Sequence, residues 1–242
     1  MEARRASRFE VLVVAPTALP GLGLLALPLV ARRIIPATDL GELLTRIWEW
    51  PADLIIITAG FAPEAIAQAC VQVRRFFQTP ILILAETADE AERIIWLDHG
   101  ADDILTRPYL SDAELVARCH ALRRRCQRQV RRDPTALRLH VAGLQLDPLA
   151  RRLYPAHGPP LDLSVAQTRL MALLLSYDDQ VVPLTVLRQH MDPQFSISVT
   201  RRIETLIRGL NHQLLNHPAR PPLIMRVRGN GYRLGFHKPP AE

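Results

Sequence analysis

The chain has 242 residues, which favours two domains over one, and 48% of them are hydrophobic, which is ample for packed cores. Three cysteines without a CxxC pair argue against structural disulfides and a zinc site. The net charge of +6 is uneven: residues 1–122 hold 11 arginines and 16 acidic residues, whereas residues 123–242 hold 19 basic and 8 acidic residues, so a polyanionic partner belongs to the second half.

An uncharged, mostly apolar segment at residues 11–31 follows Arg4, Arg5 and Arg8. Such a segment can be a signal peptide or a membrane span. Three prolines and two glycines interrupt it, however, and its first residues, VLVV, fit a buried strand. We therefore favour a cytoplasmic protein that does not associate with a membrane.

Short apolar runs alternate with helical patterns throughout the first half. The runs are β-branched and do not alternate with polar residues, as in strands buried on both faces of a parallel sheet. They lie at residues 11–15, 32–37, 53–58, 80–85 and 103–107. Helical patterns follow at 40–50, 63–77, 88–100 and 111–125. We predict a doubly wound α/β domain of five strand–helix units over residues 1–122.

An arginine-rich joint, RRRCQRQVRRDPTA, occupies residues 123–136. We interpret it as an extension of the preceding helix that continues as a solvated linker. A direct contact of this segment with DNA is the alternative.

The second half predicts an α+β domain over residues 137–238. Its first part, up to about residue 163, has the alternating pieces and turn dipeptides of a small antiparallel sheet. Ser164 and Gln167 then form a capping-box signature at the start of a helix. Helices are predicted at 164–177, 183–191 and about 197–215, followed by a hairpin at about 222–236. Three helices and a C-terminal hairpin are the winged-helix arrangement.

Four segments of the second half, in order, carry a family resemblance: GLQLDPLARRLY, LDLSVAQTRLMALLLSYDDQVV, VTRRIETLIRGL and RVRGNGYRL. They resemble the effector domain of OmpR/PhoB-type response regulators, and TPILILA with GADDILTRPYLSDAELVAR resembles the receiver domain of that family. The resemblance implies a dimeric, sequence-specific transcription regulator that binds double-stranded DNA. It implies neither an enzyme nor a bound cofactor, and we assign no catalytic residue.

The third helix of the second half is predicted to be amphipathic. Val199, Ile203, Leu206, Leu210 and Leu214 make its apolar face. The opposite face and its flanks carry Thr200, Arg201, Arg202, Thr205, Arg208 and His212. The resemblance places this helix in the DNA major groove, where arginine can donate twice to guanine and threonine can touch a thymine methyl group. An ordinary solvated face is the alternative.

The hairpin sequence RVRGNGYRL corresponds to the wing of the family, which lies against the adjacent minor groove. We expect Arg228 to enter that groove and Arg226 to contact phosphate, with Asn230 at the tip. Gly229 and Gly231 permit a tight turn and close backbone approach. Tyr232 is expected to pack the wing onto its domain.

The first half lacks the phosphorylation site of a receiver domain. The family resemblance calls for three carboxylates that hold Mg²⁺, one of which accepts phosphate, together with a hydroxyl residue and a lysine. The corresponding positions here are Ala15, Pro16, Thr58, Ala85 and Arg107. We predict no phosphorylation, no Mg²⁺ or other metal site, and no histidine kinase partner. We favour a structural remnant over a new ligand pocket formed by Thr58, Glu86 and Arg107.

Charged residues at the family's dimer face are retained. Arg93 and Glu114 match one pair, Asp103 or Asp102 matches Arg118 in another, and Asp98 with His120 is a third. These residues predict a homodimer that forms without phosphate. Solvated surface charges, whose ion pairs contribute little singly, are the alternative.

Residues 191–198, MDPQFSIS, correspond to the loop that contacts RNA polymerase in the family, so this contact is a further expectation. An adaptor whose winged helix binds a protein, or DNA non-specifically, is the alternative function. The operator, the direction of regulation, the controlling signal and the packing between domains are beyond what the sequence predicts.

Overall fold

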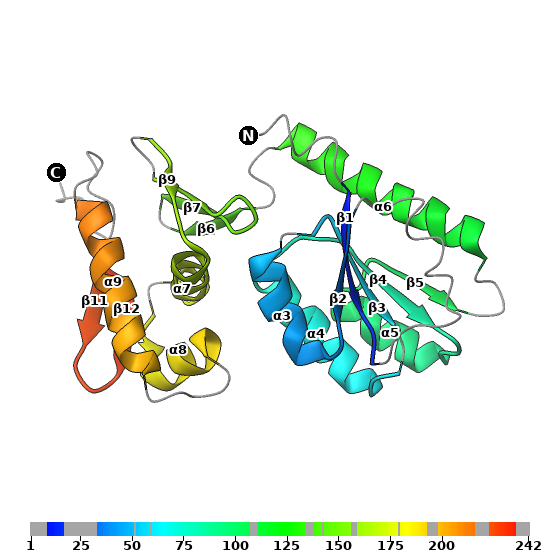
Figure 1. Ribbon diagram of the computed structural model, residues 1–242, viewed down its shortest axis with the longest axis horizontal. Coiled ribbons are helices and arrows are strands. Elements are labelled where there is room, and N and C mark those ends of the chain that lie inside the picture. The colour runs from blue at the N-terminus through cyan, green and yellow to red at the C-terminus, as the bar shows by residue number, and fades with distance from the viewer. Residues whose placement is uncertain are drawn as a thin grey trace. The chain divides into compact units, whose positions relative to one another are not determined.

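The computed structural model describes residues 9–16, 33–50, 52–58, 60–106, 111–133, 138–141, 143–155, 159–178, 180–192, 198–215 and 223–235. The chain divides into two compact units, Met1–Ala136 and Leu137–Glu242. Figure 1 shows the elements of each unit.

The first unit contains a five-stranded parallel sheet with the strand order β2-β1-β3-β4-β5. Its strands are β1 (Glu10–Val14), β2 (Arg33–Ala37), β3 (Leu54–Thr58), β4 (Ile81–Ala85) and β5 (Asp103–Thr106). Every residue of β3 and β4 is buried, which explains their continuous apolar sequence. The strand order reverses between β1 and β3, and open α/β sheets bind ligands at the C-terminal ends of strands beside such a reversal.

Helices cover both faces of this sheet (Figure 1). They are α3 (Leu40–Glu49), α4 (Pro63–Arg74) and α5 (Glu90–Asp98) on one face and α6 (Asp112–Arg132) on the other. Three of the four begin with a side-chain cap, since Asp39, Asp89 and Ser111 each accept a hydrogen bond from a backbone amide of the first turn. The predicted doubly wound α/β class is confirmed.

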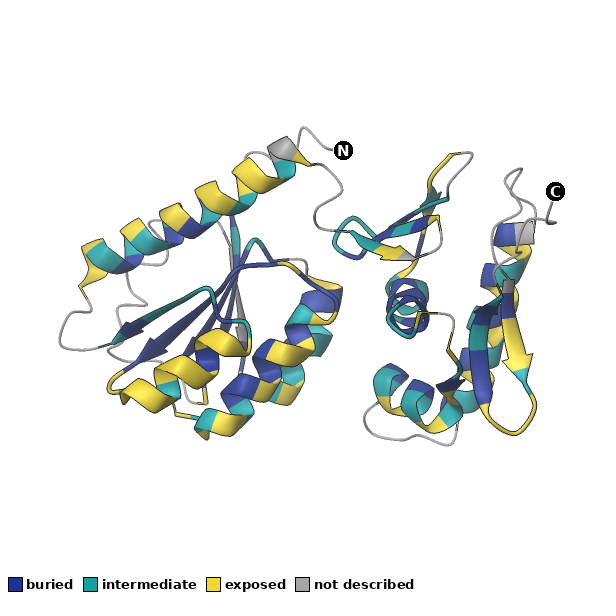
Figure 2. Cartoon of the chain, turned by 180° about the vertical axis from the view of Figure 1, so that it is seen from behind, coloured by how far each residue is buried: buried dark blue, intermediate teal, exposed yellow. Residues whose placement is uncertain are grey.

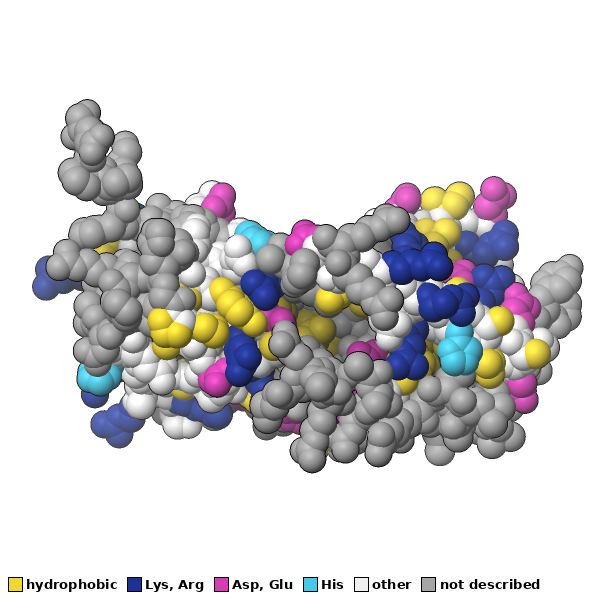
Figure 3. Space-filling view, turned by 90° about the horizontal axis from the view of Figure 1, so that it is seen from above, with side chains coloured by type: hydrophobic (Ala, Val, Ile, Leu, Met, Phe, Trp, Pro, Cys, Tyr) yellow, Lys and Arg dark blue, Asp and Glu magenta, His cyan; other side chains and the backbone are white. Residues whose placement is uncertain are grey.

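Helix α6 packs its first half on the sheet and continues beyond it. Leu115, Cys119 and Leu122 are buried against alternate residues of β1, β3 and β4. Residues 123–132, the first part of the predicted linker, are the last turns of the helix, which ends at Arg132. Arginine side chains gather over this helix in Figure 3. Residues 134–136 of the predicted linker lie outside the described residues.

The second unit begins with a four-stranded antiparallel sheet, β6-β7-β8-β9. Its strands are β6 (Leu139–Val141), β7 (Leu144–Asp147), β8 (Arg152–Tyr154) and β9 (Leu161–Asp162). Three helices follow: α7 (Val165–Leu175), α8 (Leu184–Met191) and α9 (Val199–Leu215). A second sheet has the order β10-β12-β11 and consists of β10 (Val182–Pro183), β11 (Leu223–Val227) and β12 (Gly231–Gly235).

Helix α7 is the centre of this unit (Figure 2). Residues 170–175 are all buried, and the helix contacts α8, α9 and β12. The predicted capping box is present: Ser164 Oγ accepts from the Gln167 amide at 3.2 Å, and Gln167 Oε1 accepts from the Ser164 amide at 2.9 Å. Three helices and a C-terminal hairpin confirm the predicted winged-helix arrangement.

Across the described ranges of both units, the structure has no helix long and apolar enough to cross a membrane. Most of the apolar segment discussed above, residues 17–31, lies outside those ranges.

Candidate nucleic-acid interface

The apolar face of α9 holds the helix on its unit. Val199, Ile203, Leu210 and Leu214 are buried, as predicted. The fifth buried position is Ile207, whereas Leu206, predicted to be buried, is partly exposed. Steps of four, four, three and four residues from Val199 keep these side chains on one stripe, and Ile207 lies closer to its centre than Leu206 does.

The opposite face of α9 is polar and open to solvent. Arg201, Arg202, Thr205, Arg208 and His212 are exposed, and Thr200 is half-buried. The Thr205 hydroxyl donates to the carbonyl oxygen of Arg201 at 2.9 Å. This bond uses the hydroxyl within the helix and leaves the threonine methyl group for apolar contacts. The face thus offers guanidinium donors and a methyl group on consecutive turns.

The hairpin β11–β12 presents its own basic residues beside this helix. Arg226 pairs with Tyr232 and Val227 with Gly231, so Arg228, Gly229 and Asn230 form the turn. All three turn residues and Arg226 are exposed. Tyr232 is buried, and burial raises the pKa of its hydroxyl, as expected for a residue that packs the hairpin onto its unit.

Two glycines shape the hairpin in different ways. Gly229 has a φ of +77° and open space around it, so it serves the turn alone. Gly231 has a φ of +143°, and a β-carbon there would lie 2.0 Å from the carbonyl oxygen of Val182 in β10. The close backbone approach that Gly231 permits is therefore between the hairpin and strand β10 of the same chain.

Asn211 joins α9 to the hairpin. Its Nδ2 donates to the Ile224 carbonyl and its Oδ1 accepts from the Ile224 amide, both at 2.9 Å. Among the described strands, β11 has a neighbour on one side only, so these two backbone groups bond to Asn211 rather than to another described strand. Sequence reasoning missed Asn211. Its presence inside a helix, where asparagine is a poor former, was the available signal.

A groove of about 520 Å³ lies between the helix and the hairpin. It is lined by Glu204, Ile207, Arg208, Asn211, His212, Ile224, Arg226 and Tyr232. Glu204 reaches across it, with its Oε1 3.8 Å from a guanidinium nitrogen of Arg226. Sequence reasoning also missed Glu204, because helical periodicity places it at the rim of the basic face without showing what it contacts.

Comparisons with known proteins identify the class to which this arrangement belongs. The family model described as "Transcriptional regulatory protein, C terminal" matches residues 158–234, which contain α7, α8, α9 and all but the last residue of the hairpin. A probable transcriptional regulatory protein of Picosynechococcus is 34% identical over 188 residues, 77% of this chain and 74% of that protein. The chain belongs to the OmpR/PhoB family of response regulators.

Two further relatives agree with this assignment. The alkaline phosphatase synthesis transcriptional regulatory protein SphR of Synechococcus elongatus is 35% identical over 76% of this chain and 70% of its own length. The phosphate regulon regulatory protein PhoB of Klebsiella pneumoniae is 29% identical over 76% of this chain and 78% of its own. The chain is thus a DNA-binding transcription regulator.

None of the described residues at the predicted phosphorylation site is a carboxylate. Ala15, Thr58 and Ala85 are buried at the C-terminal ends of β1, β3 and β4. The Thr58 hydroxyl donates to the Val14 carbonyl oxygen at 3.3 Å. Pro16 packs closely against Gly60. A β-carbon added at Gly60 would lie 2.7 Å from Cγ of Pro16. Arg107 lies outside the described residues.

Glu86 and Thr58, two members of the alternative ligand pocket, differ in their surroundings. Glu86, which follows β4, is exposed, and Thr58 is fully buried. In the ranges that the structure describes, no three His, Cys, Asp or Glu side chains lie close enough to hold a metal ion together.

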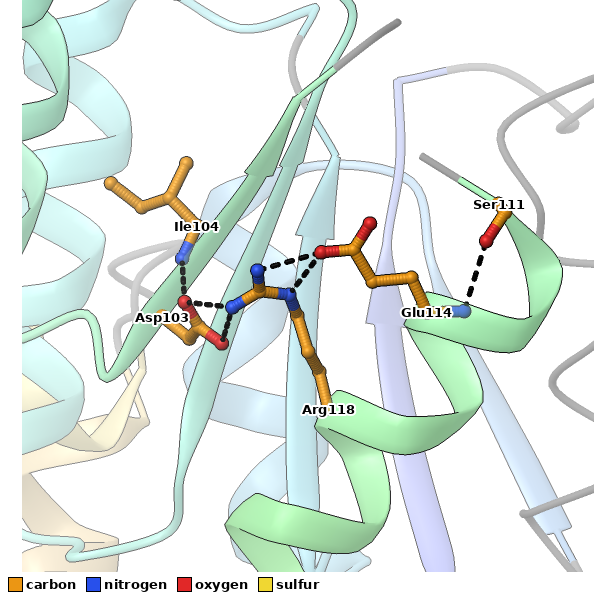
Figure 4. Close-up of polar contacts among 5 residues, drawn as sticks. All are labelled: Asp103, Ile104, Ser111, Glu114 and Arg118. Atoms are coloured by element: carbon orange, nitrogen blue, oxygen red, sulfur yellow. Dashed lines mark hydrogen bonds and ion pairs between the residues drawn. The ribbon is translucent and has the colours of Figure 1, made fainter. Parts of the chain in front are cut away.

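Arg118 connects two of the acids predicted for the dimer face (Figure 4). One nitrogen donates to both carboxylate oxygens of Asp103, at 3.0 and 2.7 Å, and two others donate to Glu114 Oε1 at 3.0 and 2.7 Å. The hydrogen bonds that Arg118 donates to Asp103 and, to a smaller extent, to Glu114 raise the pKa of the guanidinium. These contacts lie within one chain.

The remaining dimer-face residues differ in their surroundings. Asp102, the alternative to Asp103, accepts from the Arg74 guanidinium and from the Ile81 amide, and so serves the fold of its own chain. Arg93 and Asp98 are exposed on α5 and form no ion pair with the other described residues. Of the two predicted partners of Arg118, Asp102 and Asp103, it is therefore Asp103 that contacts it.

Proposed function

We propose that the regulator binds a repeated DNA sequence as a homodimer and that it does so without phosphorylation. The observation that carries the proposal is the exposed basic face of α9 beside the exposed wing. Arg201, Thr205 and Arg208 are suited to base edges in the major groove, and Arg228 is suited to the minor groove. Arg202, Arg226, Thr200, His212 and Asn230 are assigned to positioning contacts with the backbone.

Independence from phosphorylation is supported by the residues at the former acceptor site. A phosphate acceptor must be a reachable carboxylate, but Thr58 is fully buried and its hydroxyl is bonded to Val14. The Pro16 ring packs against Gly60, two residues after Thr58. Activation by a histidine kinase and Mg²⁺ has no chemical basis at such a site. A ligand pocket at Thr58 is disfavoured for the same reason.

Dimerisation is supported by the surface of α5. Ile94 and Leu97 are 51% and 47% exposed and lie one helical turn apart, so they form a small apolar patch. Arg93 precedes Ile94 and Asp98 follows Leu97 along the helix, and neither forms an ion pair with the described residues of its own chain. Arg118, Asp103 and Glu114 form an ordered charged group on β5 and α6. Apolar residues flanked by charges of both signs suit a self-complementary interface.

A regulator of this kind reads two half-sites about one helical turn apart, in tandem in this family. The loop assigned to polymerase contact includes residues 193–197, which lie outside the described residues. Contact with RNA polymerase stays part of the proposal on the family resemblance alone.

The experiment that tests the proposal is selection of genomic DNA fragments by the purified protein without a phosphodonor, at two salt concentrations. Specific contacts survive added salt better than phosphate contacts do. Enrichment of a repeated motif supports the proposal. Only salt-sensitive binding without a motif contradicts it and favours an adaptor that uses the winged helix for a protein partner.

Sedimentation on and off DNA tests the dimer separately. We expect Arg93→Glu to weaken dimerisation and cooperative binding to paired half-sites. Glu49→Arg, a charge reversal on the exposed end of α3, is the control and should change neither. A wild-type protein that stays monomeric on paired half-sites contradicts the proposed dimer.

A further inference from the structure

One acidic residue interrupts the basic character of the recognition helix. Glu204 is the only Asp or Glu between Val199 and Leu215. It lies in the second turn of α9, and residues near the N-terminus of a recognition helix are those that contact base edges. At about 100° per residue, its side chain stands roughly 60° from Arg201 and 40° from Arg208 around the helix. With α9 in the major groove as proposed above, a carboxylate at this position lies beside the DNA.

The partner of Glu204 is on the wing. Arg208 follows it by four residues, the spacing at which a glutamate commonly pairs with a basic residue on its own helix. Glu204 instead reaches Arg226 of β11, at 3.8 Å across the groove. The two side chains are 41% and 71% exposed, so the pair is long and hydrated and contributes little to stability. It opens easily when either residue finds a stronger partner.

In the proposed complex, DNA phosphates provide a stronger partner for Arg226 but repel the carboxylate of Glu204. A phosphate accepts a charge-assisted hydrogen bond from a guanidinium, and wing arginines lie beside phosphates in the proposed complex. An ionised carboxylate is an acceptor only, so it cannot bond a phosphate and is repelled by it. Once Arg226 has left, Glu204 therefore needs a hydrogen-bond donor on the DNA.

The major groove contains a suitable donor on one base in particular. Guanine presents two acceptors, and thymine presents an acceptor and a methyl group. Adenine presents its amino group beside the acceptor N7, which repels a carboxylate. Cytosine presents its N4 amino group and no adjacent acceptor of its own, and glutamate is a known acceptor from this group.

We infer that Glu204 is a specificity-determining residue that exchanges partners on DNA. In the free protein it holds Arg226. In the specific complex Arg226 passes to a phosphate, and the Glu204 carboxylate accepts a hydrogen bond from cytosine N4. Where no cytosine faces Glu204, the pair stays closed and Arg226 is withheld from the phosphate, so binding to unrelated DNA is weakened. This inference rests on the proposed function, because it requires α9 in the major groove.

The test is DNA selection with four proteins: wild type, Glu204→Gln, Glu204→Ala and Asp162→Asn. A glutamine donates to adenine N7 and accepts from adenine N6, so we expect E204Q to change one preferred cytosine per half-site to adenine. E204A should lose the preference at that position, roughly 5- to 100-fold, which is the discrimination given by one good base contact. Asp162→Asn is the matched control, because it also neutralises an acid paired with an arginine, Arg152, at 2.6 Å. It should leave the motif unchanged.

Binding to random duplex DNA tests the other half of the exchange. We expect E204Q and E204A to bind it several-fold more tightly than wild type, with a log–log salt slope steeper by about 0.9, the value for one additional phosphate contact. In an Arg226→Gln background this gain should disappear, while the change from cytosine to adenine persists in E204Q. Circular dichroism melting compares the folding of all variants.

Each outcome has a distinct meaning. If E204Q and E204A select the wild-type motif unchanged at every position, Glu204 does not read a base and the inference is overturned. The same holds if neither variant gains affinity for random DNA. If wild type itself selects no motif, the proposed function fails and the inference fails with it, a result visible in the wild-type arm alone.

Discussion

Both amide atoms of the Asn211 side chain bond the backbone of Ile224, at 2.9 Å each, and so connect the recognition helix to the edge strand of the wing. The relative position of α9 and β11 decides whether the helix and the wing can reach adjacent grooves together. A side chain that satisfies both backbone groups of one residue fixes that position in register as well as in distance.

We expect Asn211→Ala to leave the Ile224 amide and carbonyl without their partner. The free energy of unfolding of the second unit should fall by about 1–3 kcal/mol, the range for unsatisfied polar groups. Hydrogen exchange should accelerate at the Ile224 amide, and affinity for the selected DNA should fall because the wing is less well positioned. Gln189→Ala, an exposed change on α8, is the control. An unchanged exchange rate at Ile224 would contradict the assigned role.

The buried environment of Thr58 predicts that restoring an aspartate will not restore a receiver. Thr58→Asp places a carboxylate in a fully buried position whose hydrogen-bond partner is the Val14 carbonyl, another acceptor. We expect the first unit to lose about 3 kcal/mol or more of unfolding free energy. Acetyl phosphate with Mg²⁺ should label neither the wild type nor this variant.

The three tryptophans, Trp48, Trp50 and Trp96, all belong to the first unit, so tryptophan fluorescence during urea unfolding follows that unit alone. Thr58→Val is the matched control. It loses only a long hydrogen bond of 3.3 Å, so it should cost less than about 1 kcal/mol. Stable T58D protein that incorporates phosphoryl groups would show that the site is accessible after all.

Two buried thiols predict how the first unit responds to alkaline pH. Burial raises the pKa of Cys70 to about 11 and that of Cys119 to about 11. In the unfolded chain a thiol ionises near pH 8.5. Because the folded pKa is the higher one, the stabilisation is fully present below the unfolded pKa and is lost as the pH rises from about 9 towards 11.

We expect the tryptophan-monitored free energy of unfolding to fall over this window by at most about 3 kcal/mol per thiol. Cys70→Ala should be less stable at neutral pH, because it leaves a cavity, but its stability should fall less steeply with pH. The difference in slope is the measurement, since other groups also titrate in this range. Parallel pH profiles for the variant and the wild type would exclude this role for Cys70.

The sequence predicted the first unit well because buried parallel strands have a distinctive pattern. β3 and β4 are entirely buried, so their residues are apolar without alternation, and no amphipathic helix has that pattern. The end of α6 was less certain, because an arginine-rich segment suits both a helix and a linker. The helix continues to Arg132, since arginine is a good helix former, and stops next to Asp133, which precedes a proline.

The interface could be predicted only where it depends on helical spacing. Arg201, Thr205 and Arg208 follow from the period of α9, whereas Leu206 and Ile207 are adjacent and the period alone does not decide between them. Glu204 and Asn211 were missed because their importance lies in contacts with β11, which is more than ten residues away in the chain. No local pattern indicates whether a glutamate pairs along its helix or across a groove.

The last prediction distinguishes the contribution of α9 to DNA sequence preference from the contribution of the wing. Arg201→Ala removes a side chain proposed to donate to a base edge, so binding to the selected motif should weaken by about 1–3 kcal/mol and preference should relax at one position. Arg228→Ala removes a side chain proposed for the minor groove, so preference for a narrow, A·T-rich groove beside the motif should be lost while the motif is retained. Arg152→Ala removes the same charge from β8 of the same unit and should affect neither readout. If Arg201→Ala and Arg228→Ala weaken all DNA sequences equally, both residues contact phosphates only, and the base-reading side chains must be sought among the other exposed residues of α9.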